Sequence, residues 1–393
     1  MAAAGTRTLA AAPGLSRSGP DEANPACGIL GGAVSSSQVS ATPALDTALF
    51  DYPLPEERIA QTPLAERDAS LLLHLPPGDA PPEDRRFREL PSLLRAGDLL
   101  VVNDTRVRAA RLRTRTEHGG AVELLVLQNL GDGRYACLVR PGRRLTAGRK
   151  ILAGEGLRAT VEGEGGGHPG ARIVRFESED GDVDSAIERL GTVPLPPYIH
   201  AALDDPQRYQ TVFASGDPQS AAAPTAGLHF TPRIIDEINA CGVETATVRL
   251  EVGLGTFAPI RSDTVGAHEM HEERYELPQQ TADAIARTRA RGGRVVAVGT
   301  TAVRTLETCA AQPGLVTARS GSTRLFLRPG TPFNVVDGLL TNFHAPRSSL
   351  VVLLAAFVGV ERWRDAYAHA LRGDYRFLSF GDCMLCWRAN SPP

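Results

Sequence analysis

Hydrophobic positions along the chain change their period near residue 108 and again near residue 195. Between these points, short segments alternate apolar and polar residues or run apolar with β-branched residues, and glycine-rich turns separate them. The segments are AVELLVL (121–127), RYACLVR (134–140), LRATVEG (157–163) and ARIVRF (171–176). Several short strands at such spacing predict a small antiparallel β-barrel.

Outside this region, apolar strand patterns are followed by helical ones. RVVAVGT (294–300) is typical of a buried strand, and an apolar helical spacing through Val303 and Leu306 follows it. GLLTNFH (338–344) repeats the arrangement, and we expect Pro346 near the start of the next helix. Two strand–loop–helix units predict an α/β fold with a mixed or mainly parallel sheet. Ligands favour the carboxyl ends of such strands, here residues 299–304 and 342–349.

The first 46 residues are rich in Ala, Ser, Gly and Pro and have no hydrophobic period. They cannot bury a core, so we predict a disordered N-terminal extension over 1–46. The segment lacks the apolar run of a secretory signal, while an organelle-targeting sequence and a misassigned start codon stay open. We predict an α/β catalytic domain over 47–107 and 196–393, with the barrel inserted over 108–195.

Composition narrows the function classes only slightly. The net charge of −3 over 393 residues gives no overall basic surface, so a nucleic acid would have to meet a local basic patch. Lys150 is the only lysine, which disfavours Schiff-base catalysis, whereas the many arginines suit bidentate phosphate contacts. The longest apolar run, residues 350–358, is too short to span a bilayer.

Six cysteines are scattered along the chain, and only Cys383 and Cys386 form a CxxC pair. No second pair and no matched histidine spacing accompanies them, so we expect small buried residues on a strand rather than zinc or redox chemistry. Nothing indicates a disulfide framework, which favours a reducing cytosol.

The densest set of reactive groups lies between residues 224 and 277, in PTAGLHFT (224–231), RLEVGLGTF (249–257) and HEMHEERYEL (268–277). Clustered His and Glu supply groups for proton transfer or metal ligation, and Gly227, Gly253 and Gly255 allow close approach of a ligand. An HxxH on a helix would place His268 and His271 on one face, as a metal requires. On a strand they would point apart. A metal site, an acid–base or ligand contact, and a solvated charged loop all stay open.

Two further groups have the form of ligand sites. His229 lies just before a helix that we predict through Ile234 and Ile238 with Thr231 as its N-cap, where an anion is favoured; a buried, hydrogen-bonded histidine is the alternative. Thr300, Thr301 and Arg304 follow the strand at 294–300 and resemble an anion or nucleotide cradle, or a simple helix cap. Neither a Walker loop nor a GxGxxG fingerprint follows this strand.

Polar and basic residues follow the apolar strand LLVVN (99–103). Asp104 and Arg106 come first, and a basic strip continues through Arg108, Arg111, Arg113 and Arg115, of which the last three alternate and would share one face of a strand. Arg143 and Arg144 add a second basic group. This strip is either a phosphate-contact surface for a nucleic acid or an ordinary solvated face.

The three strings of the dense region, in this order, resemble the S-adenosylmethionine:tRNA ribosyltransferase-isomerase family of queuosine biosynthesis. The resemblance covers residues 48 to 388, and Ala302 and Ala345 depart from the family's pattern without removing a reactive group. Other strings that carry it are FDYPLPEERIAQTPLAERDASLLL (50–73), FRELPSLLRAGDLLVVNDTRVRAARL (87–112), RYQTVFA (208–214), GTTAVRTLE (299–307), GLLTNFHAPRSSLVVLLAAFVG (338–359) and YRFLSFGDCML (375–385).

The resemblance implies an α/β enzyme with an inserted barrel that transfers and isomerises the ribosyl group of S-adenosylmethionine. The acceptor would be 7-aminomethyl-7-deazaguanine at the wobble position of a tRNA with a GUN-type anticodon, and the product epoxyqueuosine, with release of adenine and methionine. No metal or redox cofactor is implied, and S-adenosylmethionine is the cosubstrate. We expect a cytoplasmic monomer or weak homodimer with no membrane partner.

Residue roles follow from both lines of argument. We predict His229, His271, Glu273 and Glu251 as the catalytic, proton-transferring set. Predicted substrate-binding residues are Asp104, Arg106, Thr225, Gly227, Gly253, Gly255, Thr256, His268, Thr300, Thr301, Arg304, Asn342 and His344. Predicted tRNA-binding residues are Arg108, Arg111, Arg113, Arg115, Arg143 and Arg144. Two other functions stay open: a metal-dependent hydrolase using His229, His268, His271 and His344, and a non-catalytic RNA-binding barrel.

Overall fold

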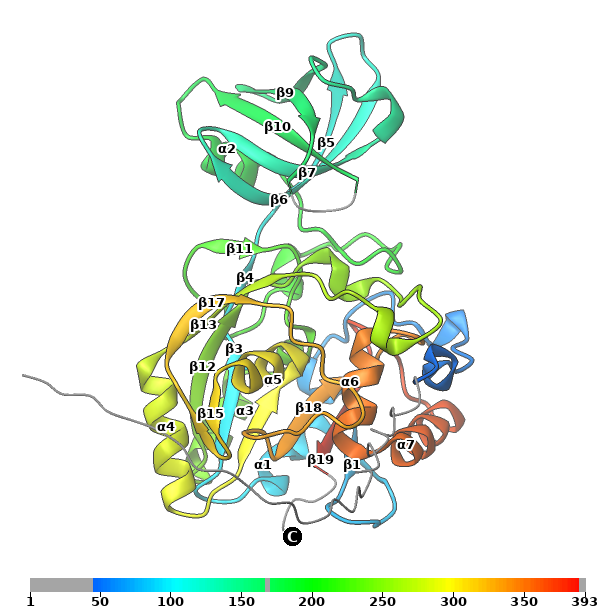
Figure 1. The fold of residues 1–393 in the computed structure, drawn as a ribbon, viewed down its shortest axis with the longest axis vertical. Helices are drawn as coiled ribbons and strands as arrows, with labels where there is room; N and C mark the ends of the chain where they lie inside the picture. Colours follow the sequence, from blue (N-terminus) through cyan, green and yellow to red (C-terminus); the bar gives the residue numbers. More distant parts are fainter. Residues whose placement is uncertain (1–44, 167–169, 389–393) are drawn as a thin grey trace, which may run out of the picture. The chain divides into compact units, whose positions relative to one another are not determined.

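A computed structural model describes residues 45–166 and 170–388. It contains a nine-stranded mixed sheet flanked by helices and a separate closed barrel of six antiparallel strands (Figure 1). The prediction of an α/β fold with an antiparallel barrel is confirmed. The predicted N-terminal extension, 1–46, lies almost wholly outside the described residues.

The sheet has the strand order β17-β13-β12-β3-β14-β18-β19-β1-β2. Its central strands β12, β3, β14 and β18 are parallel, whereas β13 runs antiparallel to β12 and β19 antiparallel to β18. Their bounds are β1 Leu71–Leu75, β2 Glu83–Arg86, β3 Leu99–Asn103, β12 Glu244–Leu250, β13 Glu273–Leu277, β14 Val295–Val298, β17 Arg319–Thr323, β18 Gly338–Asn342 and β19 Cys383–Trp387. The strands β3, β14, β18 and β19 are wholly buried, as strands covered on both faces must be.

Helices cover both faces of the sheet. Side chains alternate along β3, so Leu99 and Val101 pack in one apolar layer with α4–α7, while Leu100 and Val102 pack in the other with α1 and α3. The helices are α1 Leu90–Leu93, α2 Val183–Leu190, α3 Pro232–Ala240, α4 Gln279–Ala290, α5 Gly299–Thr308, α6 Ser349–Val358 and α7 Val360–Arg372. None of those in the described residues combines the length and apolar character that a membrane crossing needs.

Local expectations for three segments can be compared with these helices. Thr231 is the N-cap of α3, because its hydroxyl accepts a hydrogen bond from the backbone N–H of Ile234 at 3.3 Å, as predicted. Pro346 lies near the start of the next helix as expected, but in the turn before it rather than in its first turn, because α6 begins at Ser349 with Ser348 as its cap. Cys383 and Cys386 are buried on β19, as expected for a structural CxxC.

Short elements join the main ones. Two small sheets pair β4 Arg106–Val107 with β11 Pro218–Ser220 and β15 Ala310–Gln312 with β16 Leu315–Val316. The 3-10 helices are η1 Thr47–Phe50, η2 Glu56–Arg58, η3 Arg67–Ala69, η4 Phe87–Glu89, η5 Gly142–Arg144, η6 Pro206–Tyr209, η7 Thr225–His229, η8 Leu254–Phe257 and η9 Val265–Ala267.

The barrel closes in the order β10-β7-β6-β5-β8-β9 and has its own apolar core, to which α2 contributes Ala186 and Ile187. Its strands are β5 Arg111–Thr116, β6 Ala121–Gly131, β7 Arg134–Arg140, β8 Lys150–Gly154, β9 Leu157–Glu164 and β10 Ala171–Ser178. Asp132 and Gly133 turn β6 into β7 with φ of 53° and 70°, the left-handed conformation that a tight hairpin requires.

The chain enters and leaves the barrel at one place. Arg111 and Thr192 exchange backbone hydrogen bonds of 3.0 and 2.9 Å, which ties the entering segment to the leaving one. Gly191 is packed so tightly that a Cβ there would lie 1.9 Å from the carbonyl oxygen of Ala109. These contacts form a neck from which the barrel is inserted.

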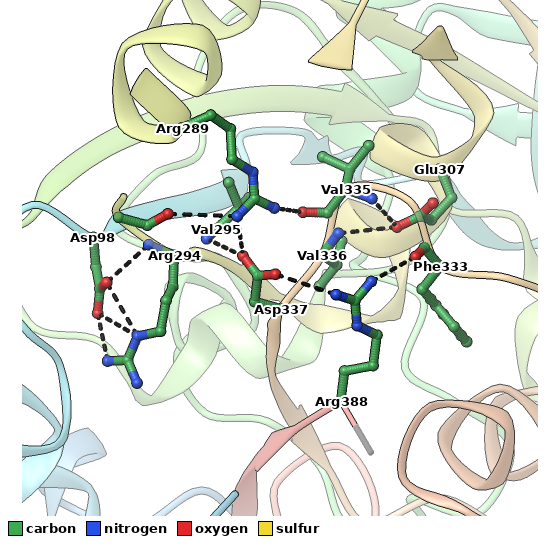
Figure 2. Close-up of polar contacts among 11 residues, drawn as sticks. Asp98, Arg289, Arg294, Val295, Glu307, Phe333, Val335, Val336, Asp337 and Arg388 are labelled. Carbon is green, nitrogen blue, oxygen red and sulfur yellow. Dashed lines mark hydrogen bonds and ion pairs between the residues drawn. The ribbon is translucent and has the colours of Figure 1, made fainter. Parts of the chain in front are cut away.

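Charged side chains fix the amino ends of the parallel strands (Figure 2). Asp98, just before β3, pairs with Arg294, just before β14, at 2.6 Å. Asp337, just before β18, pairs with Arg289 at 2.5 Å and accepts the backbone N–H of Val295 at 2.8 Å. Glu307 accepts three backbone N–H groups, from Asn334, Val335 and Val336, at 2.7, 3.0 and 3.0 Å, although burial raises the pKa of its carboxyl. These charged side chains are thus all paired with one another or with backbone groups, and they stabilise the fold.

Candidate active site at the carboxyl edge of the sheet

The opposite edge of the sheet gathers most of the predicted site residues. Thr300 and Thr301 follow β14, and Asn342 is the last residue of β18. Glu273 begins β13 at the same edge, because β13 runs antiparallel to β12. This is the edge at which ligands of parallel sheets usually bind.

A buried ion pair joins two of these residues. The side chains of Glu273 and Arg304 are each 6% exposed, and the guanidinium Nη1 donates a short hydrogen bond to the carboxylate Oε2. The other carboxylate oxygen accepts from the backbone N–H of Gly253 and the hydroxyl of Thr256, both at 3.1 Å. Arg304 Nε also donates to the carbonyl of Leu325 at 3.1 Å. Glu273 is therefore held by three donors, which favours a positioning role over proton transfer.

The ion pair lies on the wall of a pocket that we call the Arg304 pocket. Two buried polar atoms on that wall, Arg304 Nη2 and Thr301 Oγ1, have no hydrogen-bond partner among the described residues. Buried donors are almost always satisfied, so these two groups are suited to a ligand. The pocket is lined by Gly255, Thr256, His268, Met270, His271, Glu273, Thr300, Thr301, Arg304, Leu325, Phe326, Leu327, Ser349, Leu350 and Leu353.

Both histidines of the HxxH string reach the Arg304 pocket. They lie in the loop before β13, so the expectation that a strand would point them apart does not apply. His271 packs against the backbone of Gly255, where a Cβ would lie 2.0 Å from the ring carbon Cδ2. His268 contacts the edge of Phe326, and burial, then the charge of His271, lowers its pKa. Only glycine at 255 leaves His271 its place beside the pocket.

His229 lies in a different environment, on the floor of a second pocket that does not include Glu273 or His271. Its Nε2 lies 3.2 Å from the amide nitrogen of Asn342 and its Nδ1 lies 2.9 Å from the hydroxyl of Ser70. An amide nitrogen only donates, so Nε2 accepts and the proton is assigned to Nδ1. The ring stacks on Phe87, and burial, then Arg376 and Arg67, lowers its pKa to about 3. These contacts fit the alternative of a buried, hydrogen-bonded histidine.

Four other predicted residues are held by contacts away from the Arg304 pocket. Thr225 donates to Asn342 Oδ1 at 3.0 Å, and a Cβ on Gly227 would lie 2.9 Å from Thr211. His344 is buried beside Thr341 at 2.8 Å, and burial lowers its pKa to about 3. Arg106 lies 3.7 Å from Glu188. Of these, Thr225 is joined to His229 through Asn342, whereas His344 packs in the core.

Glu251 lines a third hollow of about 430 Å³ together with Arg249 and Arg274, and Asp104 contacts this group only through Arg249. Arg249 binds Asp104 with two hydrogen bonds of 3.0 Å, so this carboxylate is already paired. Glu251 is half-buried, and burial raises the pKa of its carboxyl. The structure thus separates Glu251 from the other three residues predicted to transfer protons.

The predicted tRNA-binding arginines of the barrel are partly neutralised. Arg111, Arg113 and Arg115 lie on one face of β5 as predicted. Glu123 lies 4.0 Å from Arg111 and 3.7 Å from Arg113, and Asp184 pairs with Arg108. Within the described part of the chain, Arg143 and Arg144 form no ion pair. Three other arginines, Arg67, Arg208 and Arg376, line the pocket over His229, and the sequence analysis did not single them out.

A metal site would need several ligands within reach of one point. Across residues 45–166 and 170–388, no three His, Cys, Asp or Glu side chains are grouped in that way. His268 and His271 share a pocket, but His229 and His344 lie elsewhere.

The buried histidines His229 and His344 should make the folded state less stable at acidic pH. Because the folded-state pKa of His229 and His344 is lowered from 6.5 to about 3, each contributes stability that is complete above pH 6.5 and is lost as the pH falls toward 3. When the pH is lowered from about 7 to about 5, each of these two histidines should lower the free energy of unfolding by about 2 kcal/mol. Urea unfolding at both pH values measures it. His344→Gln should remove about half of the loss, whereas His118→Gln, at an exposed turn, should leave it unchanged; equal losses in all three proteins would contradict this assignment.

Comparisons with known proteins show which family the chain resembles. The family model described as "Queuosine biosynthesis protein" matches residues 47–386. The S-adenosylmethionine:tRNA ribosyltransferase-isomerase of Moorella thermoacetica is 49% identical over 338 residues, 86% of this chain and 98% of that protein. The enzyme of the same name from Heliobacterium modesticaldum is 48% identical over 345 residues, which are 87% of this chain and 99% of that protein. A crystal structure of S-adenosylmethionine tRNA ribosyltransferase from Thermotoga maritima is similar with a TM-score of 0.50 and 39% identity, and the match covers 86% of this chain and 99% of that one.

Proposed function

The chain belongs to the queuosine biosynthesis protein family, and from this membership we propose that it is an S-adenosylmethionine:tRNA ribosyltransferase-isomerase. It transfers and isomerises the ribosyl group of S-adenosylmethionine onto 7-aminomethyl-7-deazaguanine at the tRNA wobble position. The product is epoxyqueuosine-tRNA, and adenine and methionine leave. The match over nearly the whole described chain carries this proposal.

The cosubstrate binds in the Arg304 pocket. Arg304 Nη2 and Thr301 Oγ1 are the buried groups there without partners, and the carboxylate of the methionyl part is the negatively charged acceptor that S-adenosylmethionine offers. Apolar side chains of Leu325, Leu350 and Leu353 line the same pocket and suit the adenine and the methylene groups. The cavity has a volume of only about 20 Å³, so it has to widen to admit the cosubstrate.

Proton transfers are needed at three points. The sulfonium acidifies the adjacent 5′ protons, so a base can open the reaction, adenine needs a proton or hydrogen bond as it leaves, and the acceptor amine must lose a proton. We assign proton transfer to His271, which reaches the pocket from a loop. Glu273 positions Arg304, and His229, whose two ring nitrogens are engaged, holds Asn342.

The RNA substrate must present its wobble base outside the anticodon loop, because base edges are read in single-stranded RNA. Of the barrel arginines predicted to bind tRNA, Arg115, Arg143 and Arg144 form no ion pair among the described residues, so they are the stronger candidates within that set. We propose a GUN-type anticodon, a cytoplasmic location and a monomer or weak homodimer.

Purified protein incubated with S-adenosylmethionine and tRNA that carries the aminomethyl base should release one adenine per epoxyqueuosine formed. Chromatography of free adenine and mass spectrometry of tRNA nucleosides measure the two products. The same tRNA with an unmodified guanine should give neither. We propose that no metal takes part, so EDTA should leave turnover unchanged. Well-folded protein that releases no adenine would disprove the activity, and loss on chelation with rescue by zinc would favour a metal-dependent hydrolase.

A further inference from the structure

The pocket over His229 is lined by three arginines, Arg67, Arg208 and Arg376, and by no Asp or Glu among the described residues. We propose that this pocket, which we call the arginine pocket, binds a backbone phosphate of the RNA substrate. The inference rests on the proposed function, because it names the part of the tRNA that the enzyme holds beside its active site.

The charges of these arginines are largely uncompensated. Within the described chain, Arg67 and Arg208 take part in no ion pair. Arg376 Nε lies 3.9 Å from Asp382, a carboxylate that already accepts the backbone N–H groups of Leu71 and Arg376 at 2.8 and 2.7 Å. Burial, and next the charge of Arg208, lowers the pKa of Arg67, and Asp205 offsets only part of this effect, so the positive charges act on one another inside the pocket. An anion between them would relieve that repulsion.

Two of the guanidinium groups are fixed before any ligand binds. Arg67 donates to the carbonyls of Gln210 and Gln207 at 2.7 and 2.9 Å, and Arg208 reaches back to the carbonyls of Ala65, at 3.2 Å, and Leu64. The segments around Arg67 and Arg208 thus brace each other reciprocally. A guanidinium has five N–H donors, so each keeps donors for a ligand, and Arg208 Nε is buried with no partner among the described residues. The brace lowers the entropy cost of binding.

The surroundings favour a polyanion over a single carboxylate. A second hollow of about 550 Å³ adjoins the arginine pocket and shares Arg67 and Arg208 with it. Its two acids are already paired, Asp68 with Arg233 at 2.7 Å and Glu66 with Arg88 at 3.3 Å. Two hollows that share a pair of fixed guanidinium groups suit an RNA backbone, which presents phosphates in series, and the fork of arginine matches phosphate oxygens.

The arginine pocket also lies at the edge of the sheet that carries the Arg304 pocket. His229 on its floor is hydrogen-bonded to Asn342, the carboxyl-terminal residue of β18, and β18 pairs with β14, which leads into Thr300 and Thr301. A phosphate held here would anchor a nucleotide close to the strand ends at which the cosubstrate binds. Phosphate contacts of this kind fix register while other groups do the chemistry.

Arg376 is the residue to substitute first, because it does not take part in the brace between Arg67 and Arg208. In a plot of log affinity for tRNA against log salt concentration, the slope should become smaller in magnitude by about 0.7 in Arg376→Gln, because one phosphate contact to single-stranded RNA is lost. The slope should not change in Arg376→Lys, because lysine keeps the positive charge. Arg287→Gln is the matched control, since this exposed arginine on α4 pairs with Glu244 at the opposite edge. Arg208→Gln, checked for an unchanged melting temperature, should lose slope as Arg376→Gln does.

Calorimetry with S-adenosylmethionine distinguishes the sources of the anion. Unchanged cosubstrate affinity in Arg376→Gln, together with the smaller slope, supports an RNA phosphate. Weaker cosubstrate binding with an unchanged slope would show that the pocket binds the methionyl carboxylate, and no change in either measurement would show that the arginines have a structural role. Either result overturns the inference. The proposed function would still hold as long as the wild-type protein turns over tRNA. Wild-type protein that binds no tRNA overturns both.

Discussion

Replacing His271 by alanine should lower turnover by roughly two to four orders of magnitude, the usual contribution of a positioned acid–base group. The imidazole reaches the Arg304 pocket from the loop before β13 and is packed against Gly255 rather than fixed by a buried hydrogen-bond network. Binding of S-adenosylmethionine should change little, because Arg304 and Thr301 stay in place. Single-turnover adenine release and calorimetric cosubstrate affinity separate the two effects.

Two further variants make the His271 test specific. His118→Ala, at an exposed turn of the barrel, should keep normal turnover. Gly255→Ala should also slow adenine release, because the added Cβ would lie 2.0 Å from the His271 ring and displace it. If His271→Ala turns over normally, proton transfer belongs to another group, and the family assignment still stands.

Replacing Arg304 by methionine should cost about 3–5 kcal/mol of unfolding free energy, because it leaves the carboxylate of Glu273 buried without its counter-charge. Both side chains are 6% exposed, so solvent cannot replace the lost partner. The double variant Arg304→Met with Glu273→Leu should regain most of that stability, since apolar side chains replace both charges. It should still fail to bind S-adenosylmethionine, because the donor is gone. Urea unfolding and calorimetry measure the two properties.

The buried pair of Asp98 and Arg294 is the matched control for this test. It has the same chemistry, with 2.6 Å between the charged groups, but lies at the amino edge of the sheet. Arg294→Met should destabilise the fold without weakening cosubstrate binding to the protein that stays folded. Glu273→Gln tests the role of the carboxylate: weaker cosubstrate binding supports positioning of Arg304, whereas normal binding with a large loss of turnover would show that Glu273 transfers the proton.

Much of the fold was predictable because its signals are local. The alternating strands of the barrel, the buried strand at 294–300 and the cap at Thr231 each depend on residues close in sequence. Pro346 marked the approach to α6 but not its first residue, because proline is favoured both in a first helical turn and in the loop before it, and Ser348 provides the cap.

The sequence predicted which residues belong to the candidate site, but not which of them contact one another. Glu273 and Arg304 were both candidates, but their ion pair spans two elements whose register depends on the whole sheet. The pairing of Arg111 and Arg113 with Glu123 likewise depends on strand register within the barrel. Arg67 and Arg208 escaped notice because their strings contain no recognisable chemical spacing, and only the folded chain brings them together over His229.

The neck of the barrel has an evolutionary consequence. Because Arg111 and Thr192 lie side by side and are joined by two backbone hydrogen bonds, the inserted segment begins and ends at one point of the α/β domain. A closed barrel has no free strand edge and so needs no partner strand from its host. A single insertion into a loop could therefore add the barrel to an ancestral α/β domain without altering the register of its sheet. The surface of the barrel could then change while the ends of the sheet strands stayed the same.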